Sequence, residues 1–126
     1  MAINPQEFDY KESRWQDIYT CLKNAGFDVY APQIKEGECT APYVVVANGV
    51  TTQYHNFSSE EQFYSVMCYV PKKQYSKLEP YYLSVKEAMK ELEPMLRFEK
   101  SITGSYYDDA LKAHMVSFDY INVRKS

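Results

Sequence analysis

The side chains that could do chemistry in this 126-residue chain are few and far apart in sequence. A metal centre needs thiolate, imidazole or carboxylate ligands that converge, but the only histidines, His55 and His114, have no close-spaced partner. Two pairs of adjacent carboxylates, Glu60-Glu61 and Asp108-Asp109, could act as acid and base, although such pairs on loops usually only interact with solvent. The glycines show neither the G-x-G nor the Walker spacing that cradles phosphate. We therefore predict no metal site and no cofactor.

The cysteines give little support to nucleophilic catalysis. Cys21, Cys39 and Cys68 contain no C-x-x-C pair, and their odd number suits a reducing cytoplasm. A nucleophilic Cys39 would need a base held by a third group, and the surrounding sequence Gly37-Glu38-Cys39-Thr40 matches no such signature. We predict that the chain is not an enzyme, and a thiol enzyme that uses Cys39 is a remote alternative.

One segment interleaves cations with an aromatic ring. Lys72, Lys73 and Lys77 flank Tyr75, a pattern typical of grooves that bind single-stranded nucleic acid. The same pattern is typical of the solvated start of an amphipathic helix, and the formal net charge of −3 disfavours a polyanionic partner. A single-stranded nucleic-acid-binding module is a second remote alternative.

The composition is that of a globular domain with an unusual amount of tyrosine. The length predicts a single domain over residues 1–126, with residues 1–12 as an N-terminal arm. The longest apolar run, Tyr43 to Ala47, is far shorter than the roughly 18 to 20 residues that cross a bilayer, so we expect no membrane partner. The 13 tyrosines favour either a protein-binding surface or an aromatic core.

Hydrophobic periodicity predicts two helices. Apolar residues at i, i+3, i+4 and i+7 predict the first over Ser13 to Asn24, with Ser13 and Gln16 as a capping box and Gly26 as its stop. The second is predicted to begin at a capping box formed by Ser76 and Glu79 and to end before Pro94.

Alternation of apolar and polar residues predicts the strands. Asn48-Gly49 predicts a tight turn between two of them, and the segments 33–41 and 103–109 are predicted to be loops. The predicted strands are Phe27–Tyr30, Tyr43–Val46, Val50–His55, Phe63–Val70, Met95–Glu99 and Ala113–Val123. The resulting order, α-β-β-β-β-α-β-β, favours an α+β fold with a mainly antiparallel sheet and both helices packed on one face.

Taken together, the elements resemble a known family of virion proteins. The chain from Trp15 to Arg124 is similar to the tail terminator, or tail completion, proteins of contractile-tail phages, prophages and phage-tail-like bacteriocins of Gram-positive bacteria. The segments that carry the resemblance are Val29-Tyr30-Ala31-Pro32, Cys39-Thr40-Ala41-Pro42-Tyr43-Val44-Val45-Val46, Met67-Cys68-Tyr69-Val70-Pro71, Leu92-Glu93-Pro94-Met95 and Lys112-Ala113-His114-Met115-Val116-Ser117.

The resemblance implies a structural role in the virion. Such a protein forms a ring, usually a homohexamer, that caps the last ring of the tail tube, stops its polymerisation and docks the tail to the neck and head. Its partners would be further copies of itself, the tail tube, the sheath and neck or connector proteins, with DNA passing through the lumen without specific binding. Its place would be the tail–neck junction, after assembly in the bacterial host cytoplasm; a neck or head-to-tail adaptor is the closest alternative.

A ring without an active site depends on exposed strand edges and on anchoring side chains. We expect the edge strand Val50–His55 to contribute main-chain pairing between subunits. Four aromatic side chains in predicted loops or strand edges are the candidates for interface anchors: Tyr54, Phe57, Tyr106 and Tyr107.

Overall fold

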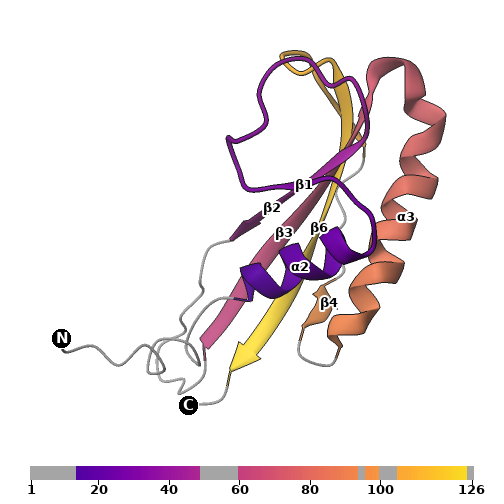
Figure 1. The fold of residues 1–126 in the computed structure, drawn as a ribbon. Helices are drawn as coiled ribbons and strands as arrows, with labels where there is room; N and C mark the ends of the chain where they lie inside the picture. Colours follow the sequence, from indigo (N-terminus) through magenta and orange to yellow (C-terminus); the bar gives the residue numbers. More distant parts are fainter. Residues whose placement is uncertain (1–13, 49–59, 94–95, 100–104, 125–126) are drawn as a thin grey trace.

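The fold combines helices and a sheet in the order that Figure 1 follows along the chain. The computed structural model describes residues 14–48, 60–93, 96–99 and 105–124, so the predicted N-terminal arm 1–12 lies outside the described residues. The described elements are helix α2 (Trp15–Asn24), strands β1 (Val29–Tyr30), β2 (Tyr43–Asn48) and β3 (Glu60–Pro71), the 3₁₀ turns η1 (Lys72–Lys77), helix α3 (Leu78–Met89), the 3₁₀ turn η2 (Lys90–Leu92), and strands β4 (Arg97–Glu99), β5 (Tyr106–Asp108) and β6 (Ala113–Arg124).

The strands form one mostly antiparallel open sheet. Its order is β1-β2-β3-β6-β4, and β5 pairs with a different stretch of β6 from β4. Only β1 runs parallel to its described neighbour, β2. The long central pair β3 and β6 is in register from Glu60 opposite Arg124 to Pro71 opposite Ala113. The predicted α+β fold with a mainly antiparallel sheet is confirmed.

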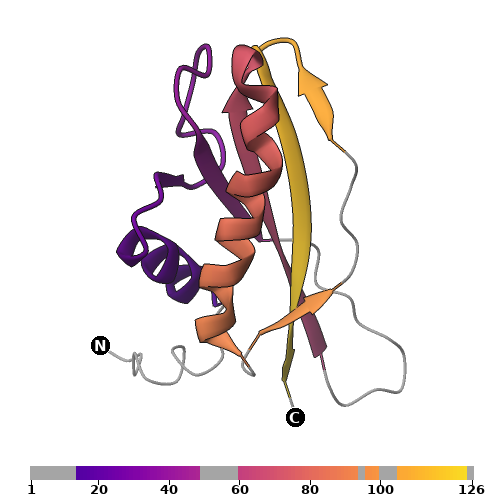
Figure 2. The same cartoon turned by 90° about the vertical axis from the view of Figure 1, so that its right-hand side faces the viewer.

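Both helices pack on one face of this sheet (Figure 2). Because side chains alternate between faces, every second residue from Tyr64 to Val70 of β3 and from Val116 to Tyr120 of β6 points toward the helices, and this row is buried. Ile18 and Leu22 of α2 and Val85 and Met89 of α3 complete the core, and all four are essentially inaccessible to solvent. Burial of this apolar surface is the main force that holds the helices on the sheet.

A smaller cluster lies on the other face of the sheet, beneath the loop 31–42. Cys39 from the loop packs there with Tyr43 of β2 and Ala113 of β6. The rings of Tyr43 and Tyr69 stack with centroids 4.9 Å apart. The start of β2 is therefore covered on both faces, as its continuous apolar run predicts.

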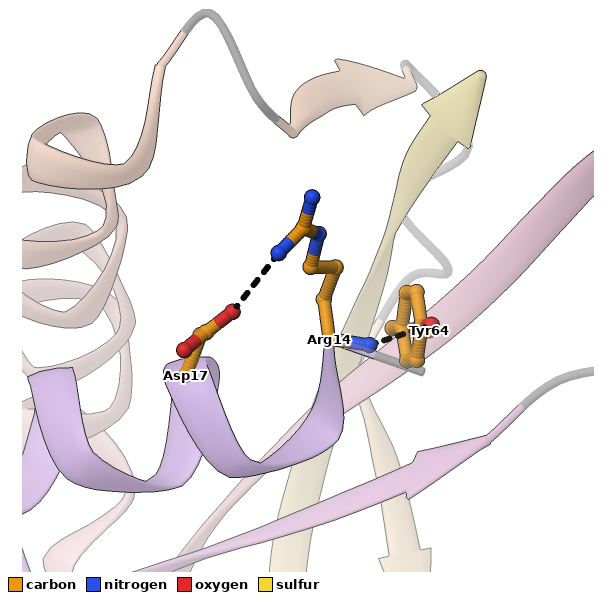
Figure 3. A network of polar contacts seen from close by, with 3 residues as sticks. All are labelled: Arg14, Asp17 and Tyr64. Atoms are coloured by element: carbon orange, nitrogen blue, oxygen red, sulfur yellow. Dashed lines mark hydrogen bonds and ion pairs between the residues drawn. The ribbon is translucent and has the colours of Figure 1, made fainter. Parts of the chain in front are cut away.

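The ends of α2 are satisfied by two kinds of hydrogen bond. At the C-terminus, Gly26 has φ +99° and its N–H donates to Lys23 O, while Phe27 N–H donates to Leu22 O, which is a Schellman motif. The predicted stop at Gly26 is thus confirmed. At the N-terminus, Arg14 N–H donates to the Tyr64 hydroxyl at 2.7 Å (Figure 3). Ser13, predicted to cap this helix, lies outside the described residues; the N-cap is Arg14, with no side-chain cap, so the predicted capping box is wrong.

The second predicted capping box is wrong. Ser76 and the residues before it form the 3₁₀ turns η1, and α3 begins at Leu78 with Lys77 as its N-cap and no side-chain cap. Ser76 already has helical neighbours on both sides, whereas a capping residue needs an extended backbone. Pro80 still lies in the first turn of α3, where its missing N–H breaks no helical hydrogen bond.

Two segments predicted as loops form strands, and one predicted strand lies outside the described residues. The loop predicted over 103–109 contains the strand β5, which three residues of β6 hold by backbone pairing. Glu60-Glu61, predicted as a polar loop, are the first residues of β3 because β6 extends far enough to pair with them. The predicted strand Val50–His55 and Gly49 of its turn lie outside the described residues, and within the described chain β3 is the antiparallel neighbour of β2.

The two sides of the sheet differ in how their edges are closed. β1 covers only Val44 and Val45 of β2. The next carbonyl outward, Val46 O, accepts a hydrogen bond from the Trp15 indole N–H at 2.6 Å. Helix α2 therefore protects the edge at β2, in the way proteins guard an edge strand against unwanted pairing. The opposite side of the described sheet is formed by β4 and β5.

Candidate functional site

The predicted interface residues fall into two groups. Tyr54 and Phe57 lie outside the described residues. Tyr106 and Tyr107 are neighbours in β5, at the outer side of β6. Because successive residues of a strand face opposite ways, Tyr106 is 53% exposed while Tyr107 turns inward next to His114. The two tyrosine side chains therefore lie in different environments. The sequence could not distinguish them, because this segment was predicted to be a loop.

The structure brings β5 together with the lysine-rich segment η1. Tyr75 of η1 packs against His114 with ring centroids 4.7 Å apart, and Tyr107 packs against the same imidazole at 5.2 Å. The Tyr75 hydroxyl lies 3.3 Å from Ser105 Oγ, directly before β5. Lys72 Nζ lies 5.9 Å from the centroid of the Tyr107 ring, within cation–π range. Two segments that the sequence analysis singled out separately thus form one surface.

We call this surface the basic–aromatic edge. It consists of Lys72, Lys73, Tyr75, Lys77, Tyr107 and His114. Tyr75 is 54% exposed and presents one large aromatic ring to solvent there, whereas Tyr106, opposite Met115, faces the other side of the sheet. The packing of His114 between two tyrosines was not predictable from sequence, since nothing there brings η1 next to β6.

The charge of the basic–aromatic edge is not neutralised locally. Lys73 and Lys77 are exposed and form no salt bridge within the described chain. Asp108 and Asp109 at the end of β5 have partners of their own: Asp108 Oδ1 accepts the Leu111 backbone N–H at 3.1 Å, and Asp109 lies 3.4 Å from Lys112 Nζ. A surface with an exposed ring and unpaired lysines fits a partner that offers both apolar contact and carboxylates.

One polar group in this region lacks a partner. The Tyr107 hydroxyl is buried and makes no hydrogen bond in the described structure. A buried hydroxyl without a partner has lost its hydration without compensation, which costs roughly 1–3 kcal/mol. This group gives a direct test of the inward orientation of Tyr107.

The cysteines are arranged as protonated packing residues. Cys39 is 4% exposed, and its thiol donates to the backbone carbonyl of Ala41 at 3.3 Å. Burial raises the pKa of Cys39, and the positive charge of the nearby Lys35 opposes this only in part. Burial also raises the pKa of Cys21 and of Cys68. A raised pKa disfavours the thiolate, which is the nucleophilic form.

The described tyrosines divide between core and surface. Tyr43, Tyr64 and Tyr120 are buried, whereas Tyr75 and Tyr106 are exposed. The aromatic-core interpretation therefore applies to the buried tyrosines, and a protein-binding role of the exposed ones stays a prediction. No group of three or more His, Cys, Asp or Glu side chains in the described ranges could hold a metal ion, and no helix there is long and apolar enough to cross a membrane.

Comparison with known proteins does not assign the chain to a family. No protein-family model matches it, and no curated protein matches it significantly. The functional interpretation therefore depends on the resemblance described above and on the surface just described.

Proposed function

We propose that this protein is a structural virion subunit that forms a ring at the end of a phage tail tube, stops tube polymerisation and docks the tail to the neck. The observation that carries the proposal is the basic–aromatic edge, where η1 presents the exposed ring of Tyr75 and unpaired lysines beside the outer strand β5. An exposed aromatic anchor next to an edge strand is typical of surfaces that bind protein.

The unequal edges of the sheet support a ring. A closed ring of identical subunits uses a contact between two different surfaces, repeated until the rotation closes. Here the edge at β2 is closed by the Trp15 indole, while on the other side β5 pairs, within the described residues, only with β6. Unlike surfaces at opposite sides of one subunit suit head-to-tail assembly.

The proposed partners follow from the position at the end of a tail. They are further copies of this chain, the tail tube, the sheath, and neck or connector proteins. DNA would pass through the lumen, and the formal net charge of −3 is compatible with passage without specific binding.

The proposal is tested in a phage or bacteriocin producer that lacks this protein. We expect tail tubes of uncontrolled length in electron micrographs, restored to uniform length by the wild-type chain. Tubes of normal length that fail to join heads would instead indicate the neck or head-to-tail adaptor. Normal tails on normal heads would overturn both.

A nucleic-acid-binding module is the second candidate, because the structure places Lys72 and Tyr75 in one surface with Tyr107. It predicts binding of a single-stranded oligonucleotide that weakens steeply with salt and is lost in Lys72→Ala/Lys73→Ala/Lys77→Ala. Absence of salt-dependent binding would remove this candidate.

A further inference from the structure

The loop 31–42 projects from the sheet in a defined conformation. It leaves β1, and Figure 2 shows much of it beside β1 and β2, while its Cys39 end reaches the turn that follows β5. Ile34 N–H donates to Ala31 O at 3.3 Å, and Cys39 N–H donates to Leu111 O at 2.7 Å. Gly37 has φ +85°, a left-handed conformation that other residues adopt only at a cost. The loop is therefore held at both ends and shaped by glycine.

The side chains of this loop separate into inward and outward groups. Lys35 Nζ lies 5.3 Å from the ring centroid of Tyr30 and 5.7 Å from that of Tyr43, so its charge is turned back onto the subunit. Glu36 and Glu38 are exposed and form no salt bridge within the described chain. Ile34 is 64% exposed, the most exposed large hydrophobic residue of the described chain.

We define the acidic loop as Ile34, Glu36 and Glu38, and we propose that the acidic loop of one copy docks on the basic–aromatic edge of the next copy. Ile34 lies against the ring of Tyr75, and the two carboxylates pair with Lys73 and Lys77. This contact deepens the proposed ring, and it depends on that function being correct.

Complementary chemistry favours a second copy over other occupants. The basic–aromatic edge offers an exposed ring and unpaired ammonium groups, and the acidic loop offers an exposed apolar side chain and unpaired carboxylates. A nucleic acid or an unrelated acidic peptide would cover the edge but leave Ile34 in water. A second copy covers both surfaces at once, and because the surfaces are unlike, the contact is head-to-tail, as a ring requires.

Charge reversal on each surface tests the contact. The loop variant is Glu36→Lys/Glu38→Lys, and the edge variant is Lys73→Glu/Lys77→Glu. In either one alone, like charges face each other across the contact, and we expect self-association to weaken by roughly tenfold or more. Sedimentation velocity over a concentration series measures the effect. Far-UV circular dichroism and thermal unfolding check that each variant is folded.

Mixing the two variants distinguishes a direct contact from a general charge effect. The loop variant carries a cationic loop that fits the edge variant's anionic surface, and the reverse pairing retains the native charges. We therefore expect an equimolar mixture to assemble, and the chain that carries all four substitutions to assemble alone. Glu87→Lys/Glu91→Lys makes the same change of charge at exposed positions near the C-terminal end of α3, and it should assemble like the wild type.

Each outcome of these experiments supports or contradicts the proposed contact. Assembly of both single-surface variants at wild-type strength would overturn it, as would folded variants that fail to assemble when mixed. Lysine variants that lose oligonucleotide binding but keep assembly would assign the edge to nucleic acid instead. If the wild-type chain never self-associates, alone or on tail tubes, the proposed ring itself is wrong. If rings form in every variant, only the contact is wrong.

Discussion

Two tyrosine hydroxyls, those of Tyr64 and Tyr107, are buried, and they differ in hydrogen bonding. Tyr64 accepts the Arg14 backbone N–H at 2.7 Å and so satisfies one of the free donors at the start of α2. The Tyr107 hydroxyl has no partner in the described structure. Removal of the hydroxyl oxygen should therefore affect stability differently at Tyr64 and at Tyr107.

We predict opposite results for the two Tyr→Phe substitutions. Tyr64→Phe leaves the Arg14 N–H without its partner, and the free energy of unfolding should fall by about 1–2 kcal/mol. Tyr107→Phe removes a hydroxyl that is buried without compensation, and stability should be unchanged or rise by up to about 1 kcal/mol. Urea unfolding of both variants beside the wild type measures the difference. A loss of stability in Tyr107→Phe as large as in Tyr64→Phe would contradict this assignment.

Sequence reasoning found the residues of the basic–aromatic edge more readily than their arrangement. It singled out Tyr106 and Tyr107 as anchors and noted the pattern of Lys72, Lys73 and Tyr75. The sequence could not show that these residues lie close together, because they are far apart in sequence and meet only after β5 pairs with β6. The bond between Arg14 and Tyr64 was missed for the same reason, since no local pattern records a partner on a distant strand.

Among the helices and strands, hydrophobic periodicity predicted the long elements correctly. The apolar face of α2, the helix that ends before Pro94 and the alternation in β3 and β6 all correspond to elements of the structure. The strand β5 was missed because three residues are too short to show a period of two. The polar start of β3 was missed because backbone pairing with β6 holds it, whatever its side chains are.

The protection of the β2 edge gives a prediction at this scale. Trp15→Phe keeps an aromatic ring near Tyr19 but removes the indole N–H that bonds Val46 O. We expect the free energy of unfolding to fall by about 1–2 kcal/mol, because the carbonyl at the edge of β2 loses its donor. Amide hydrogen exchange should also quicken in β2. The exposed Gln16→Ala, one position along α2, is the matched control, and equal effects of the two changes would count against a role for the indole.

For the whole molecule, buried tyrosines and cysteines make stability depend on alkaline pH. Burial, with smaller contributions from neighbouring groups such as Cys39 and Tyr69, raises the pKa of Tyr43 to about 12. Burial also raises the pKa of Cys39 and of Tyr69. In the unfolded chain these groups ionise at about 8.5 for cysteine and about 10 for tyrosine. At a pH between the unfolded-state pKa and the folded-state pKa of such a group, the group is ionised in the unfolded chain and protonated in the folded chain.

Stability should therefore be constant near neutral pH and fall as pH rises. The unfolded state binds fewer protons than the folded state from about pH 8.5 upward, so the free energy of unfolding declines there and continues to decline towards the folded pKa of Tyr43, about 12. Urea midpoints at a series of pH values measure the decline, which should be shallower above about pH 10 in Tyr43→Phe. Midpoints that do not change across this alkaline range would contradict the burial of these groups.

The central claim concerns the whole molecule: identical copies close into a ring through unlike surfaces at opposite sides of the sheet. Electron microscopy of the purified wild-type chain, alone and after mixing with tail tubes, tests it most directly. We predict closed rings of one size, seated at one end of each tube and blocking further growth. A chain that stays monomeric at every concentration and leaves tubes bare and growing would contradict the claim.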